Sequence, residues 1–136
     1  MAISTRNTLW GSKEVTAMNE SILDSIKAML GGNLLGEDTA FDSELIPLIN
    51  MALNTLVQIG AGPSQGYNIT SKDNVWSEFI GDDAMLLDMV KSYCHIKVKL
   101  LWDNLTTPSA VLEVLKEQLK ELEVRISWRV DPNNTF

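Results

Sequence analysis

Residues that commonly carry catalysis or bind metals are scarce in this sequence. It contains one cysteine, Cys94, and one histidine, His95, among 136 residues. A lone cysteine excludes an intrachain disulfide and a zinc site built from several thiolates. Neighbouring positions on a helix point about 100° apart, so Cys94 and His95 are poorly placed to act together as nucleophile and base. An enzyme that uses His95 with an acidic residue is therefore a weak hypothesis.

Loops that bind phosphate or metal ions are also missing. Gly60-Ala61-Gly62 follows an expected helix rather than a strand, and no Gly-Lys-Ser/Thr completes it. Asp82 and Asp83 could hold a divalent cation, but adjacent acids at a helix start are better explained by capping and by the helix dipole. The sequence therefore predicts no enzyme activity, no cofactor and no metal ion.

Long hydrophobic runs are absent as well. No apolar stretch approaches the roughly 18–20 residues that cross a bilayer. The polar start Met1–Arg6 is not followed by the apolar core of a signal peptide. We therefore expect a protein made in a cytosolic compartment, with no membrane partner. Its length, with 45% hydrophobic and 21% charged residues, is typical of one soluble globular domain.

Positive charge is nearly missing from the middle of the chain. The net charge is -7, and residues 37–83 contain Lys72 as their one basic residue. The acids of this segment are Glu37, Asp38, Asp42, Glu44, Asp73, Glu78, Asp82 and Asp83. An acidic surface repels phosphate backbones, so tight binding to nucleic acid is not expected. Two interpretations remain open: a solvated face that aids solubility, or a surface that lies near DNA without adhering to it.

Apolar residues at helical spacing predict an all-α fold of four helices. The expected helices run from Asn19 or Ser21 to Gly31, from Asp42 to Ile59, from Asp82 or Asp83 to Trp102, and from Thr107 to Arg129. The second helix is apolar over more than half its circumference, so we expect it to be the most buried. Residues 1–18 form an N-terminal arm, residues 19–130 the helical domain, and residues 131–136 a C-terminal tail.

Several helix ends and faces can be predicted in detail. Asp42 should cap the second helix, and Pro47 marks either a kink or a later start. Thr107 should be the N-cap of the fourth helix, with Pro108 as its first residue. The expected buried face of the third helix is Met85, Leu86, Met89, Val90, Tyr93, Ile96, Leu100 and Leu101. The expected coiled-coil-type seam of the fourth is Leu112, Leu115, Leu119, Leu122 and Ile126. Off that seam, Val111, Val114 and Val124 suggest a second contact surface.

The connection over residues 60–81 is long for a compact domain, and such loops often have a function. Residues 73–80 should include one short helical turn. Its Trp76 and Phe79 have two interpretations: they cover the core, or they contact a partner.

The order of these segments can be compared with known families. The relevant runs are Glu20–Gly31 (ESILDSIKAMLG), Asp42–Asn50 (DSELIPLIN), Gly60–Pro63 (GAGP), Ile69–Asp73 (ITSKD), Trp76–Gly81 (WSEFIG), Met89–Tyr93 (MVKSY), Lys97–Asp103 (KVKLLWD) and Ile126–Arg129 (ISWR). In their order and spacing, over about residues 19–131, the sequence resembles the head–tail connector (adaptor) proteins of long-tailed bacteriophages and their prophages.

The resemblance implies a structural subunit rather than an enzyme. It implies a homo-oligomeric ring of about twelve copies beneath the portal protein of a DNA-filled capsid. The ring would extend the channel for double-stranded DNA without binding it tightly, and would dock the next neck or tail component (a stopper or tail-completion protein). The expected location is the virion neck, after assembly in the host bacterial cytoplasm. No cofactor is implied.

Two groups of residues follow as candidates for these roles. The candidate contacts with the portal or another partner are Trp128, Arg129, Asp131 and Phe136, and in the long loop Trp76 and Phe79. The candidate channel-facing acids are the eight of residues 37–83 named above. The competing hypothesis is a small helical regulatory or scaffold protein that binds one protein partner through its C-terminal helix.

Overall fold

The computed structural model describes residues 17–31, 39–102 and 107–131, and five helices lie within them. They are α2 (Ile22–Gly31), α3 (Asp42–Ile59), α4 (Trp76–Ile80), α5 (Ala84–Trp102) and α6 (Ser109–Val130). The all-α class is confirmed. The four-helix count is not, because the five-residue α4 interrupts the connection expected between the second and third long helices. Most of the arm, all of the tail beyond Asp131, and the candidates Glu37, Asp38 and Phe136 lie outside the described residues.

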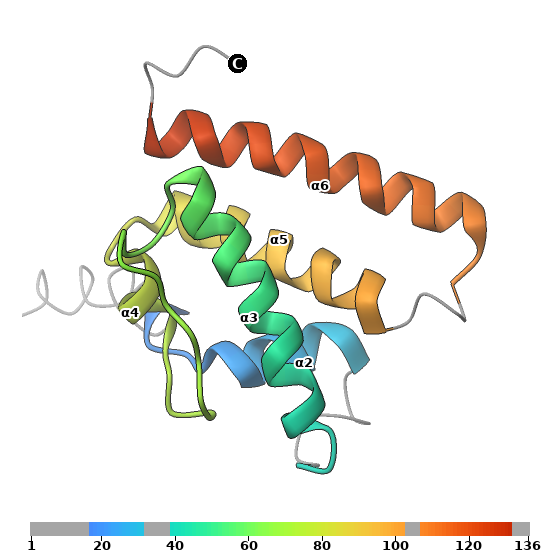
Figure 1. The fold of residues 1–136 in the computed structure, drawn as a ribbon, viewed down its shortest axis with the longest axis horizontal. Helices are drawn as coiled ribbons and strands as arrows, with labels where there is room; N and C mark the ends of the chain where they lie inside the picture. The colour runs from blue at the N-terminus through green and yellow to red at the C-terminus, as the bar shows by residue number, and fades with distance from the viewer. Residues whose placement is uncertain (1–16, 32–38, 103–106, 132–136) are drawn as a thin grey trace, which may run out of the picture.

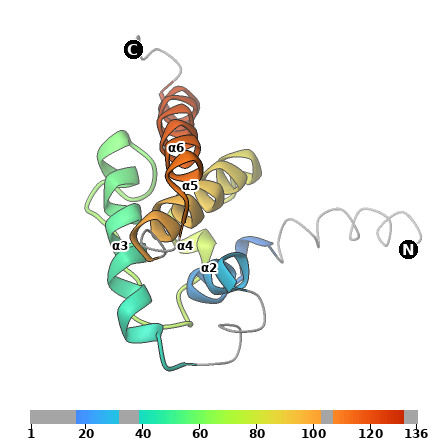
Figure 2. The same ribbon diagram turned by 90° about the vertical axis from the view of Figure 1, so that its right-hand side faces the viewer.

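Helices α3 and α5 form the middle of the molecule. α5 packs against all four other helices, and α3 also packs against α2 and α6. Figure 1 shows α6 along one side and α2 along the opposite side, and the turned view in Figure 2 shows the same order. α6 is therefore covered on one side only, which explains why Leu119, Ile126 and Ser127 are its buried residues.

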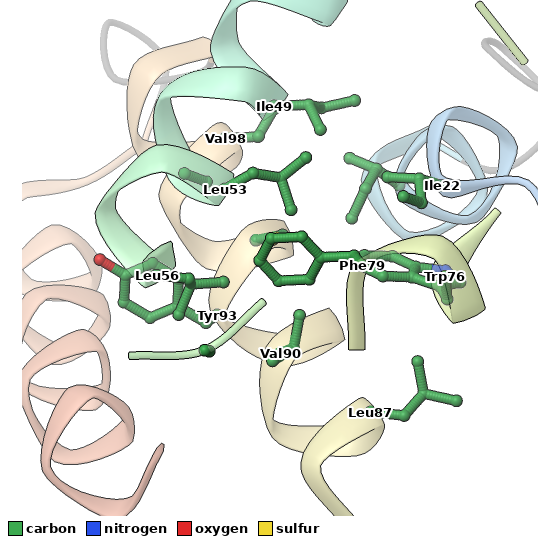
Figure 3. Packing of buried hydrophobic residues seen from close by; sticks show 14 of the residues in the cluster. Ile22, Ile49, Leu53, Leu56, Trp76, Phe79, Leu87, Val90, Tyr93 and Val98 are labelled. Carbon is green, nitrogen blue, oxygen red and sulfur yellow. The ribbon is translucent and has the colours of Figure 1, made fainter. Parts of the chain in front are cut away.

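The core is built where α2, α3, α4 and α5 meet. Trp76 and Phe79 of α4 lie among apolar side chains of the other three helices, as Figure 3 shows for Ile22, Leu53 and Val90. Burial of one such large side chain contributes about 1.5–3 kcal/mol. Ala17 and Met18, which the sequence assigned to the arm, also pack on this cluster.

The start of α3 differs from the expected cap. Phe41 is the N-cap residue, and no side chain caps this end. The Asp42 carboxylate instead accepts a hydrogen bond from Lys27 Nζ of α2 at 2.8 Å. Lys27 is only 2% exposed, and a buried ammonium group needs such a partner. Pro47 lies inside α3, which begins at Asp42 as predicted.

Two predicted helix faces are only partly right. Met85 and Leu101 of α5 are exposed, whereas Leu87, Cys94 and Val98 are buried. Because α5 is packed from several sides, its buried arc is wider than one amphipathic stripe and lies at a different angle. On α6, the seam residues Leu119 and Ile126 are buried and the other three are half-buried. Here Pro108, not Thr107, is the N-cap residue.

The connection from α3 to α4 is anchored by side chains. Gly60 caps α3 in the left-handed conformation, as its φ of 112° shows. Asn50 of α3 pairs with the backbone of Ile69 in both directions, at 3.0 Å to the carbonyl and 2.7 Å from the amide. Ile69 is buried, so this loop has its own apolar anchor in the core.

Candidate interaction surfaces

The residues suited to catalysis are packed in the helical core or half-buried beside it. Cys94 is buried, and burial raises the pKa of its thiol. The pKa of His95 is lowered, chiefly by burial and also by the nearby Lys99. Within residues 17–31, 39–102 and 107–131, no three His, Cys, Asp or Glu side chains are grouped so that they could hold a metal ion. None of the helices in that same part combines the length and apolarity needed to cross a membrane.

The end of α6 presents an exposed aromatic residue on a fixed helix. Trp128 is 53% exposed. The next residue, Arg129, donates from Nε and from a terminal nitrogen to the two carboxylate oxygens of Asp83, each at 3.0 Å. These hydrogen bonds lower the pKa of Asp83, with partial burial acting in the opposite direction. Arg129 thus ties the end of α6 to the start of α5, and Trp128 beside it points its side chain outward.

The Asp83–Arg129 pair joins two residues that the sequence assigned to different roles. Asp83 was a candidate channel acid and Arg129 a candidate partner contact. Their separation of 46 positions leaves no local signal for the pairing. Asp131, the next candidate, is exposed just beyond α6.

The other candidate contact region, around α4, has its aromatic residues inside the core. Trp76 is 0% exposed and Phe79 is 2% exposed. The Trp76 indole N–H donates to Ser25 Oγ at 3.1 Å. Of the two interpretations, core packing is the one that matches the positions of Trp76 and Phe79. A direct contact with a partner would require these side chains to move out of the core.

A polar network on the outside of this region holds the loop to α4. The Tyr67 hydroxyl donates to Glu78 at 2.7 Å, and Asn74 Nδ2 donates to the same oxygen at 3.1 Å. These two hydrogen bonds lower the pKa of Glu78. Burial raises the pKa of Tyr67, and its bond to Glu78 raises it further. Glu78, also a candidate channel acid, is thus a structural hydrogen-bond acceptor.

The remaining described acids of the middle segment divide into two groups. Asp42 and Asp83 form ion pairs within the chain, as described above. Glu44, Asp73 and Asp82 are exposed. The exposed three are therefore the acids most available to a channel or to solvent.

An apolar surface remains on the side of α6 that faces away from the core. Val111 and Val114 are exposed, and Val124 is half-buried. Glu113, Glu117 and Glu121 run along the same side, each paired with a base one turn further on, at 3.6, 3.7 and 2.9 Å. Val114 and Val124 line this surface together with the glutamates, and Val111 lies outside it. The second contact surface expected from the off-seam valines stays a prediction.

Comparisons with known proteins give one match that covers most of the chain. No curated protein and no solved structure matches it significantly. The family described as "Phage connector protein" matches residues 22–133, a range that begins at the first residue of α2 and includes all five described helices. This chain therefore belongs to the phage connector protein family.

Proposed function

We propose that the protein is a structural head–tail connector subunit that assembles into a ring under the portal. The family match over residues 22–133 is the observation that carries this proposal. The buried Cys94 and half-buried His95 fit a structural role better than a catalytic one. Helix α6 is covered by other helices on one side only, and exposed valines lie on the rest of its surface. A ring subunit could bury this apolar area against its neighbours.

The end of α6 is the proposed contact with the portal. Trp128 is a large apolar side chain that is 53% exposed beside the Asp83–Arg129 pair. Exposed aromatic residues on rigid supports are typical anchors of protein interfaces. The loop of residues 60–75, whose shape is held by Asn50 and Glu78, is the proposed docking region for the next neck or tail component.

Trp128→Ala should weaken portal attachment while leaving the fold intact. We expect at least about a tenfold loss of affinity for the portal, the range of an interface anchor. Negative-stain imaging of the wild type mixed with its portal should show rings, and binding assays should show the loss in the variant. A small stoichiometric complex with no ring would favour the regulatory or scaffold hypothesis. Unchanged binding would remove Trp128 from the interface. Met51→Ala is the control, since Met51 is 50% exposed but lies on α3.

The ring is also proposed to form an acidic passage for double-stranded DNA. The net charge of -7 is multiplied by the number of copies, and a negative wall repels phosphate at short range. Among the acids of residues 37–83 that the structure describes, Glu44, Asp73 and Asp82 are exposed and do not take part in the contacts described for Asp42, Glu78 and Asp83.

Reversing Glu44, Asp73 and Asp82 together to lysine should slow genome ejection, because each copy would then attract the DNA backbone. Infectivity of reconstituted particles and the rate of DNA release are the measurements. The matched control replaces Glu20, Asp24 and Asp88 by lysine, which are exposed, lie outside residues 37–83 and outside α6, and change the net charge equally. Ejection that stays at the wild-type rate in the first variant would show that these three acids do not line the channel.

A further inference from the structure

The outward side of α6 forms an open groove of about 570 Å³ that no described element covers. Val114 and Val124 supply its apolar lining, and Val114 is 56% exposed. Three glutamates and one lysine also line it, so its charge is negative. Their ion pairs along the helix are exposed, and such pairs contribute little, so the glutamates can accept a second partner.

Residues 1–16 have the matching chemistry. They contain Arg6 and Lys13 against one acid, Glu14, and their apolar residues include Leu9 and Trp10. A basic segment with an aromatic residue complements an acidic groove with an apolar lining. Sixteen residues in extended form span about 50 Å. Because α6 is only about 33 Å long, a segment of this length can cross a gap between two subunits and still cover the groove.

The start of the described chain and the groove lie on opposite sides of the subunit (Figures 1 and 2). The described chain begins beside α2 and is held there: Met18 is buried, Asn19 accepts a hydrogen bond from Ser77 of α4, and Glu20 pairs with Lys91 of α5. Figures 1 and 2 place α2 and α6 on either side of α3 and α5. In a ring with head-to-tail contacts, opposite sides of each subunit meet those of its neighbours.

We infer that residues 1–16 dock into the α6 groove of the neighbouring copy and link the ring from subunit to subunit. Trp10 and Leu9 would cover Val114 and Val124, and Arg6 and Lys13 would approach the three glutamates. This inference rests on the proposed ring, and it adds which segment and which surface join one subunit to the next.

Disulfide cross-linking between two differently tagged full-length chains tests the inference. One chain carries Gly11→Cys next to Trp10, and the other carries Gln118→Cys in the groove. Both substitutions leave the proposed apolar contacts intact. The native Cys94 is buried and stays out of the reaction. We expect a cross-linked pair of unlike chains, both in concentrated protein and in assemblies with the portal. Met85→Cys, more exposed than the groove valines but on α5, is the control and should give at least about tenfold less product.

Val114→Asp, combined with the same cysteines, should reduce the product similarly, because it places a charge in the apolar contact. Cross-links formed only within one chain, or no product in either sample, would overturn the inference. Rings seen by imaging without the cross-link would leave the proposed function standing and remove this contact. A cross-link formed without rings would support the contact between copies and would count against the proposed ring.

Discussion

Replacing Trp76 by alanine should lower the free energy of unfolding by about 3–5 kcal/mol, the usual range for a large aromatic residue removed from a core. Trp76 is 0% exposed and is among the largest fully buried side chains. Its indole N–H bonds to Ser25 of α2, so the substitution also removes a link between α4 and α2. Urea unfolding followed by circular dichroism measures the change.

The matched control is the same substitution at Trp128. That side chain is 53% exposed, and a surface truncation changes stability by only about 0.5 kcal/mol. The two variants therefore separate two roles for the same residue type: Trp76→Ala should lose stability, and Trp128→Ala should lose portal binding. If Trp76→Ala fails to fold, Trp76→Phe keeps most of the apolar volume and should cost about 1–2 kcal/mol. Equal stability of the Trp76→Ala variant and the wild type would place Trp76 outside the core.

Local chemistry explains which parts of the fold the sequence predicted. The apolar spacing of Ile22, Leu23 and Ile26 and the glycine at residue 60 act within one or two turns, so helix positions and ends follow from them. The face of α5 depends on which helices surround it. Met85 was expected inside because its spacing fits an amphipathic stripe, yet no described helix covers that position. Tertiary packing, which has no local signal, decides such cases.

The candidate surfaces show the same division. Exposure of Trp128 at the end of α6 fits a contact residue. The ion pairs Lys27–Asp42 and Asp83–Arg129 bring together residues 15 and 46 positions apart, and neither pairing could be read from spacing along one helix. As a result, the sequence assigned Asp42 and Asp83 to helix capping or to the channel surface, whereas both form ion pairs between helices. A charge pattern alone does not distinguish a channel acid from the partner of a buried lysine.

Replacing Gly62 by alanine should destabilise the protein by roughly 2–5 kcal/mol, the sum of two separate penalties. Gly62 has a φ of +80°, a left-handed conformation that disfavours any side chain. A Cβ atom there would lie 2.5 Å from Cε1 of Phe79. Phe79 is itself 2% exposed and packs against Tyr67, so its ring has little room to move. Thermal and urea unfolding measure the loss.

Gly66 offers a control that separates the two penalties. Its φ is +98°, but nothing lies within 4 Å of a Cβ placed on it. Gly66→Ala should therefore show only the backbone penalty of about 1–2 kcal/mol. The difference between the two variants in free energy of unfolding measures how closely the α3–α4 loop packs against Phe79 of α4. Equal losses of stability in the two variants would show that the Phe79 ring can move away from the new Cβ atom without cost. The loop would then be a loose connection rather than a surface of fixed shape, and the proposal that it docks the next neck component would lose its structural support.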